Sequence, residues 1–135
     1  MTKRTNISAA IAFCLYLATV ALLCFAHGNK LPDIGGTWLG LPADKVAHAV
    51  MFLPFIPLSF FTFRRQKASR LEGMLLVTFL LVLGAGTAYI TEIIQEKYCH
   101  RAYDIKDFAA DCIGLWLGYT FVSTWIFIKR KRKGS

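Results

Sequence analysis

The sequence lacks the signatures of the common metal sites and hydrolases. Its four cysteines, Cys14, Cys24, Cys99 and Cys112, form no CxxC pair, and three of them fall inside apolar stretches. We therefore expect neither a zinc site built on cysteine nor a disulfide framework. The chain also has no HExxH motif and no nucleophile elbow. An enzymatic function would have to rest on a constellation of residues and not on one motif.

Acidic residues are scarce as well, at 8 against 16 lysines and arginines, which gives a formal net charge of +8. The basic residues gather at the start, at the end and in one short connection, between long apolar runs. This distribution is typical of the cytoplasmic loops of membrane proteins, so we expect no nucleic-acid partner and both termini in the cytoplasm. The clusters are Lys3 and Arg4, then Arg64, Arg65, Lys67 and Arg70, then Lys129, Arg130, Lys131, Arg132 and Lys133.

Hydrophobic residues make up 56% of the 135 residues. Four stretches reach the length of about 20 residues that crosses a bilayer core. We place these spans at residues 7–26, 46–63, 71–92 and 107–128 of a single all-α domain over residues 1–135, a bundle of four transmembrane helices. The first run is longer than the apolar core of a secretory signal, about 7–15 residues, so we expect it to be retained as a helix.

The connection between the first two spans is rich in glycine and proline, yet it also carries Trp38 and several aliphatic residues. We expect this outer loop to lie at the membrane interface, with Trp38 in the aromatic belt. In the second span, Pro54 and Pro57 should bend the helix, because each removes a backbone donor. In the third span, Gly84 and Gly86 could allow close packing.

Polar residues gather at the outer ends of spans two, three and four. Asp44 and His48 open the second span one turn apart, so they could share a hydrogen bond or an ion. Thr91, Glu92 and Gln95 close the third span on one broad face. The fourth span brings residues at alternating spacings of three and four, which share one helical face, and its small residues allow helices to approach closely. That face consists of Asp104, Asp107, Ala110, Asp111, Gly114 and Gly118, with Arg101 placed to neutralise a carboxylate.

Ionisable groups are costly at the mouth of a membrane bundle, so they are candidates for function. The alternative is a structural network of salt bridges that fixes helix register. The catalytic candidates are Asp44, His48, Glu92 and Asp107, and the binding candidates are Lys45, Thr91, Gln95, Arg101, Asp104 and Asp111. A divalent cation, if one is bound, would be held by Asp44, His48, Glu92, Asp107 and Asp111.

These residues form three motifs: D-K-x-x-H from Asp44, T-E-x-x-Q from Thr91, and R-x-x-D-x-x-D-x-x-x-D-x-x-G-x-x-x-G from Arg101. In this order they resemble the VanZ-like membrane proteins, over roughly residues 40–120. The family often has Asn where this chain has Asp111. The resemblance implies a small multi-pass protein of the bacterial cytoplasmic (inner) membrane, in a family whose name-giving members are associated with resistance to the glycopeptide teicoplanin.

Three functions remain open at this point. The polar mouth could bind an envelope lipid headgroup or a lipid-linked cell-wall precursor at the outer leaflet. It could instead be a membrane enzyme, with a divalent cation activating water or with Glu92 and His48 as acid and base. A proton- or ion-coupled carrier is disfavoured, because no ionisable residue continues the path through the inner half of the spans. The expected partners are membrane lipids, and the sequence does not predict the oligomeric state.

Overall fold

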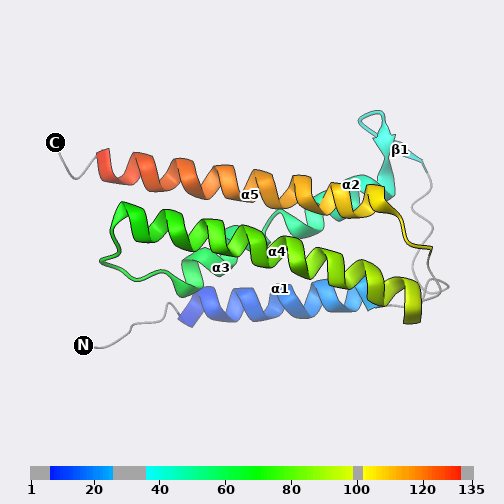
Figure 1. Cartoon of the computed structure of the whole chain (residues 1–135), viewed down its shortest axis with the longest axis horizontal. Helices are drawn as coiled ribbons and strands as arrows, with labels where there is room; N and C mark the ends of the chain where they lie inside the picture. Colours follow the sequence, from blue (N-terminus) through cyan, green and yellow to red (C-terminus); the bar gives the residue numbers. More distant parts are fainter. Residues whose placement is uncertain (1–6, 26–35, 99–101, 132–135) are drawn as a thin grey trace.

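The structure is a computed structural model that describes residues 7–25, 36–98 and 102–131. Within these residues the chain is almost entirely helical, with one small hairpin (Figure 1). Four helical segments are long and apolar enough to cross a membrane, which confirms the predicted all-α bundle. The elements are α1 (Ile7–Phe25), β1 (Thr37–Trp38), β2 (Leu41–Pro42), α2 (Ala43–Phe52), α3 (Phe55–Phe63), α4 (Arg70–Tyr98) and α5 (Ile105–Lys131).

The second span is a broken helix, made of α2 and α3. It breaks at Leu53 and Pro54, where the Pro54 ring removes one donor of the helical ladder. The expected bend is therefore a short interruption. Pro57 falls in the first turn of α3, where a missing backbone donor costs no helical hydrogen bond.

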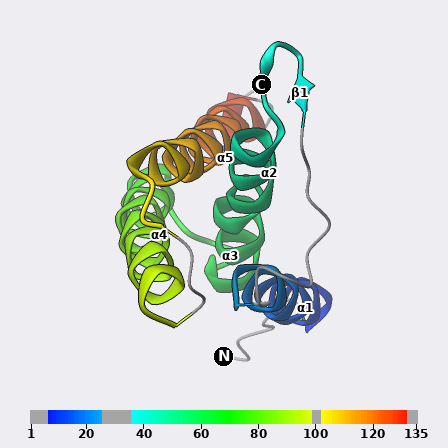
Figure 2. The ribbon, with the colours of Figure 1, turned by 90° about the vertical axis from the view of Figure 1, so that its right-hand side faces the viewer.

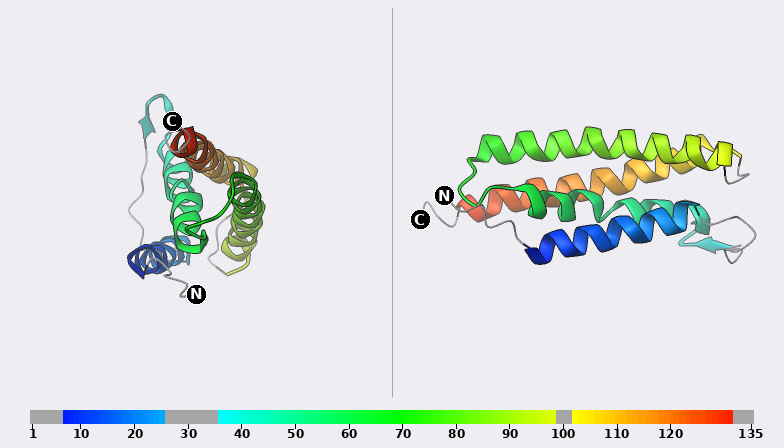
Figure 3. Two further views of the ribbon diagram at one scale, coloured as in Figure 1. Left: turned by 90° about the vertical axis from the view of Figure 1, so that its left-hand side faces the viewer. Right: turned by 90° about the horizontal axis from the view of Figure 1, so that it is seen from below.

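The α2–α3 segment lies in the middle of the bundle. The end-on views place α5 and α4 on one side of it and α1 on the other (Figures 2 and 3). α5 packs against α2, α3 and α4, whereas α1 packs mainly against α3. Cys24 is the one fully buried residue of α1, and Phe13 and Tyr16 are half-buried against the core, so most of the remaining surface of this helix is exposed.

The apolar core fills the middle and inner part of the bundle, around Phe55, Ile56 and Leu115. Gly84 lets α4 come close to this core, since a Cβ atom there would lie 2.7 Å from Leu115 Cδ2. Gly86 has no such role, because a Cβ atom at that position would meet nothing within 4 Å among the described residues. Of the two glycines expected to allow packing, only Gly84 does so.

Two helix starts are fixed by side-chain caps. Ser69 and Glu72 form a reciprocal capping box at α4: the Glu72 amide donates to Ser69 Oγ at 3.1 Å, and the Ser69 amide donates to Glu72 Oε2 at 2.6 Å. Asp104 precedes α5, and its Oδ1 accepts a hydrogen bond from the Lys106 amide at 2.8 Å. The residue that caps α5 is therefore one of the predicted binding candidates.

The outer connection contains a two-residue β-hairpin that the sequence did not predict. Leu39 and Gly40 at its tip both have positive φ, as the tight turns of two-residue hairpins require. The tip is apolar, with Leu39 99% and Trp38 62% exposed. This exposure fits the expected place at the interface, whereas the remainder of the outer loop, residues 26–35, lies outside the described residues.

Candidate functional site

The N-terminal ends of α2 and α5 and the C-terminal end of α4 bring together one group of polar side chains. We call it the polar cluster; it consists of Lys45 and His48 from α2, Glu92 from α4, and Asp107 and Asp111 from α5, with Asp44 of α2 and Asp104, which precedes α5, at its exposed rim. The cluster lies at the end of the bundle that carries the hairpin, opposite the connection between α3 and α4 (Figure 1). The predicted convergence of three outer helix ends is present in the structure.

Two glycines place α5 directly against α2. A Cβ atom at Gly114 would lie 2.1 Å from the Ala49 carbonyl oxygen, and one at Gly118 would lie 2.7 Å from the Leu53 carbonyl oxygen. Backbone contact this close is possible only without a side chain. Because Asp111 precedes Gly114 by one turn on the same face, the glycines carry its carboxylate into reach of α2.

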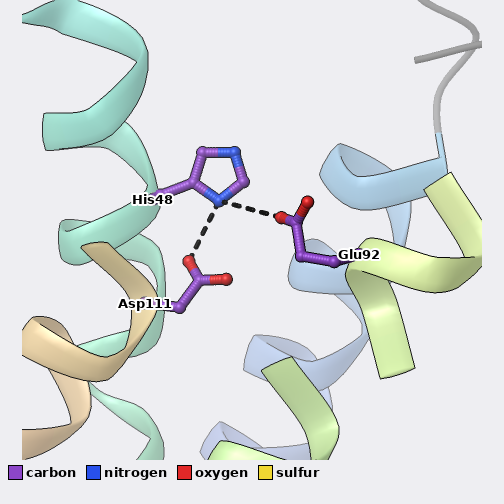
Figure 4. Close-up of side chains that lie close together, drawn as sticks. All are labelled: His48, Glu92 and Asp111. Carbon is purple, nitrogen blue, oxygen red and sulfur yellow. Dashed lines mark hydrogen bonds and ion pairs between the residues drawn. The ribbon is translucent and has the colours of Figure 1, made fainter. Parts of the chain in front are cut away.

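His48 is the centre of the polar cluster. Its Nδ1 lies 3.0 Å from Asp111 Oδ1 and 3.9 Å from Glu92 Oε1, and its Nε2 lies 3.8 Å from Asp107 Oδ2. Figure 4 shows the imidazole, the Glu92 carboxylate and the Asp111 carboxylate pointing toward one another from three helices. Three acidic side chains thus surround one buried imidazole.

Lys45 joins the rim of the cluster to its interior. Its Nζ donates to Asp104 Oδ2 at 2.5 Å and to Asp107 Oδ1, and it pairs with Asp44 Oδ2 at 3.1 Å. The hydrogen bond from Lys45 is the main reason that the pKa of the Asp104 carboxyl lies below its usual range. The Lys45 ammonium group has three N–H donors, and it contacts three carboxylates. It therefore has no donor left for another anion.

The cluster becomes steadily more buried from its rim inward. Side-chain exposure falls from 38% at Asp104 through 19% at Lys45 and 13% at Asp107 to 1% at Asp111. At the buried end, Asp111 Oδ2 accepts no hydrogen bond from any described residue. A buried carboxylate oxygen without a donor is costly, so this atom marks a position where a cation would be stabilised.

The donor set suits a metal ion. One ligand atom each from His48, Glu92 and Asp111 can be chosen so that all lie within 4.8 Å of one another. Ligands at about 2.1 Å from an ion in tetrahedral arrangement are separated by roughly 3.4 Å, so the widest pair would have to approach by at most about 1.4 Å to close the set. One imidazole and two carboxylates favour a first-row divalent ion such as Zn²⁺ or Mn²⁺.

Asp44 does not take the place that helical spacing suggested for it. It lies in the first turn of α2, is about half exposed and pairs with the adjacent Lys45. The partner of His48 is Asp111, 63 positions away, because the close packing of α5 on α2 puts that carboxylate nearer. Asp107 reaches His48 from the other side but falls outside the three-residue ligand set.

Thr91 and Gln95 are buried beside the cluster, but their described contacts are with the backbone. Thr91 Oγ1 donates to the Ala88 carbonyl at 2.7 Å, and Gln95 Nε2 donates to the Cys24 carbonyl at 3.0 Å. Gln95 therefore ties α4 to the end of α1. Arg101, the predicted neutralising cation, lies outside the described residues, and Lys45 pairs with Asp104 in the structure.

α1 contributes to the architecture of the site, although it contains no acidic or basic residue. Tyr16 Oη donates to the Met51 carbonyl at 2.8 Å, close to the break between α2 and α3. This satisfies a carbonyl near the interrupted helical ladder and holds α1 against α2. The only signal in the sequence was a tyrosine within an otherwise apolar helix.

A family model described as VanZ/LLP1 matches residues 20–128. The match covers all of the polar cluster, all of α2, α3 and α4, and α5 up to residue 128. No curated protein and no solved structure matches the chain significantly.

Proposed function

The chain belongs to the VanZ/LLP1 family, and on this premise we propose that its polar cluster binds a phosphate-bearing headgroup of an envelope lipid or lipid-linked cell-wall precursor through a divalent cation. The observation that carries the proposal is the convergence of His48, Glu92 and Asp111 at the buried end of the cluster. The ion would be held by these three residues and would present its remaining positions to the headgroup.

The charge of the cluster supports a cation as the first ligand. Around Lys45 and His48, the described structure gathers Asp44, Glu92, Asp104, Asp107 and Asp111. Such an excess of carboxylates repels an anionic headgroup, and Lys45 is already engaged. A bound divalent ion would offset part of this repulsion and would offer a ligand position to a phosphate oxygen.

The position of the cluster supports a ligand from the membrane interface. The cluster opens to the surface at Asp44 and Asp104, next to the hairpin, whose backbone is tied to α2 by a hydrogen bond from the Ala43 amide to the Gly36 carbonyl. The exposed Trp38 and Leu39 are suited to the headgroup region. A lipid headgroup beside the hairpin would thus be at the depth of the polar rim.

The membrane orientation is part of the proposal. The connection between α3 and α4 carries Arg64, Arg65 and Lys67 at the end opposite the cluster (Figure 1). The positive-inside rule places this end in the cytoplasm, so the cluster would face the outer side of the bacterial cytoplasmic membrane, with both termini inside. A contribution to glycopeptide (teicoplanin) resistance would follow if the headgroup belongs to a cell-wall precursor.

A metal-assisted membrane enzyme is the second candidate. Three protein ligands leave positions open on a divalent ion, which is the arrangement of catalytic metal sites, and Asp107 lies near His48 on the solvent side as a possible base for water. A carrier has less support. In the described half of the bundle away from the cluster, the buried polar side-chain atoms are hydroxyls and carry no charge: those of Ser59 and Thr62 donate to backbone carbonyls, and Ser123 Oγ has no described partner.

The test uses Mn²⁺ as a paramagnetic probe in purified protein reconstituted with a phosphate-bearing lipid. We expect pulsed electron paramagnetic resonance to detect a ³¹P coupling to the bound ion when the lipid is present and to lose it with a lipid-free detergent. Hydrolysis of the lipid in the same sample would favour the enzyme. Mn²⁺ binding without any ³¹P coupling would contradict headgroup recognition but would still support the metal site.

In cells, the proposal is tested by lipid and precursor profiling of a deletion strain that is complemented by the wild type or by Asp107→Asn. We expect the wild type to restore the profile and the variant, inserted at the same level, to fail. Teicoplanin susceptibility is measured on the same strains. Full complementation by Asp107→Asn would show that the function does not need the Asp107 carboxylate and would leave that residue a structural role.

A further inference from the structure

A second polar feature lies at the other end of the molecule. The inner ends of α3, α4 and α5 and the connection between α3 and α4 border an open-sided cavity of about 560 Å³, which we call the inner pocket. Its volume is within the range of about 300–1,000 Å³ that is common for ligand sites. The basic residues that line it are Arg64, Arg65, Lys67, Arg70 and Lys129.

The inner pocket has charge of one sign. Among the described residues that line it, none is acidic. Glu72 follows nearby in α4, but its carboxylate accepts the Ser69 amide in the capping box. Five cations around one cavity repel one another, so an anion bound between them is stabilised by several charges at once.

Aromatic rings hold three of the cations in place. The Arg64 guanidinium lies 4.7 Å from the centre of the Trp125 ring and 5.0 Å from that of Phe61, and Lys129 Nζ lies 4.5 Å from the Trp125 ring centre. Arg70 stacks on Phe127 at 4.6 Å. A cation over a ring keeps its N–H donors available, so these contacts position the groups without occupying them.

Burial lowers the pKa of the Arg64 guanidinium, and among the described residues no charged neighbour offsets the effect. The side chain therefore sits where its charge is incompletely solvated. A phosphate would supply the missing counter-charge and accept a bidentate pair of hydrogen bonds. Basic pockets between the cytoplasmic ends of transmembrane helices are suited to such headgroups.

We propose that the inner pocket binds the headgroup of an anionic phospholipid, with a preference for headgroups that carry two phosphates. A single phosphodiester brings one negative charge to five cations, whereas a diphosphate headgroup can reach Arg64 and Lys129 on one side and Arg70 on the other. The proposal concerns the end of the bundle opposite the polar cluster and does not depend on the function of that cluster.

Thermal unfolding of the purified full-length protein tests the proposal, with phosphatidylcholine, phosphatidylglycerol or cardiolipin added to the detergent. Because a ligand of the native state raises its stability, we expect the melting temperature to rise in the order of these three lipids. Arg64→Gln/Arg70→Gln should bind cardiolipin roughly 30-fold more weakly, as expected for two lost charges. Lys97→Gln/Lys106→Gln removes two exposed charges from the outer ends of α4 and α5 and should respond like wild type.

A second variant, Arg65→Gln/Lys67→Gln, changes exposed residues of the connection and leaves the cation–π contacts intact, so it tests the pocket even if the first variant folds poorly. Equal cardiolipin stabilisation of wild type, this variant and the control would overturn the proposal. So would binding of inorganic pyrophosphate as tight as that of cardiolipin, since the ligand would then be a soluble phosphate compound.

Discussion

His48 Nδ1 lies 3.0 Å from Asp111 Oδ1, in a part of the bundle where neither side chain is more than 9% exposed. The two residues come from different spans and are 63 positions apart. Their meeting depends on Gly114, which lies one turn after Asp111 and allows α5 to touch the backbone of α2. The site is therefore as sensitive to helix packing as it is to its own ligands.

Gly114→Ala should separate α5 from α2 and disrupt the cluster. The added Cβ would lie 2.1 Å from the Ala49 carbonyl oxygen. Because this oxygen belongs to the backbone of α2, it cannot move away without a shift of the helix. We expect a loss of about 1–3 kcal/mol, the usual cost of overpacking, measured by thermal unfolding in detergent. Gly86→Ala is the matched control; its Cβ would meet no described residue within 4 Å, and the variant should be neutral or slightly stabilising. Equal stability of the two variants would show that α2 and α5 do not touch at Gly114.

Lys45→Met should destabilise the protein because it leaves Asp104 and Asp107 without their shared cation. We expect Lys45→Met/Asp107→Asn to recover part of the loss, with a coupling energy of about 1–3 kcal/mol in a double-mutant cycle. Thermal unfolding of the four proteins provides the measurement, and Lys106→Met, at an exposed lysine of α5, is the control. Strict additivity would mean that the two side chains do not interact.

Asp104 should contribute a pH-dependent part of the stability. Lys45 lowers the pKa of its carboxyl in the folded protein, so folding favours the ionised form. The contribution is present above the unfolded-state pKa, near 3.8, and is lost as the pH falls through the lower folded value. Asp104→Asn keeps the helix cap but removes the charge, so its melting temperature should fall less steeply below pH 4. Parallel curves for both proteins would contradict this linkage.

The four spans and their polar outer ends were predictable, because an apolar run of membrane length leaves few alternatives. The break in the second span also followed from Pro54. The prediction that Asp107, Asp111 and Gly114 lie on one face of α5 was correct, since helical spacing alone determines which residues share a face.

Which residues pair between spans was not predictable. Spacing along one helix suggested Asp44 as the partner of His48, whereas packing between helices selected Asp111. The hairpin was missed because Leu39 at positive φ is not a usual turn residue. The capping box at α4, by contrast, was readable from Ser69 and Glu72 at the required spacing.

The central claim, a divalent cation held by His48, Glu92 and Asp111, is tested most directly by Mn²⁺ binding to the chelator-treated purified protein. We expect one strongly bound Mn²⁺ per chain with a ¹⁴N modulation from the imidazole in pulsed electron paramagnetic resonance. His48→Gln should remove the ¹⁴N modulation. Asp111→Asn should weaken Mn²⁺ binding at least tenfold. The melting temperature of metal-free Asp111→Asn should stay within a few degrees of that of the wild type. Mn²⁺ affinity that is the same in wild type and both variants, or the absence of a nitrogen signal in the wild type, would contradict the account.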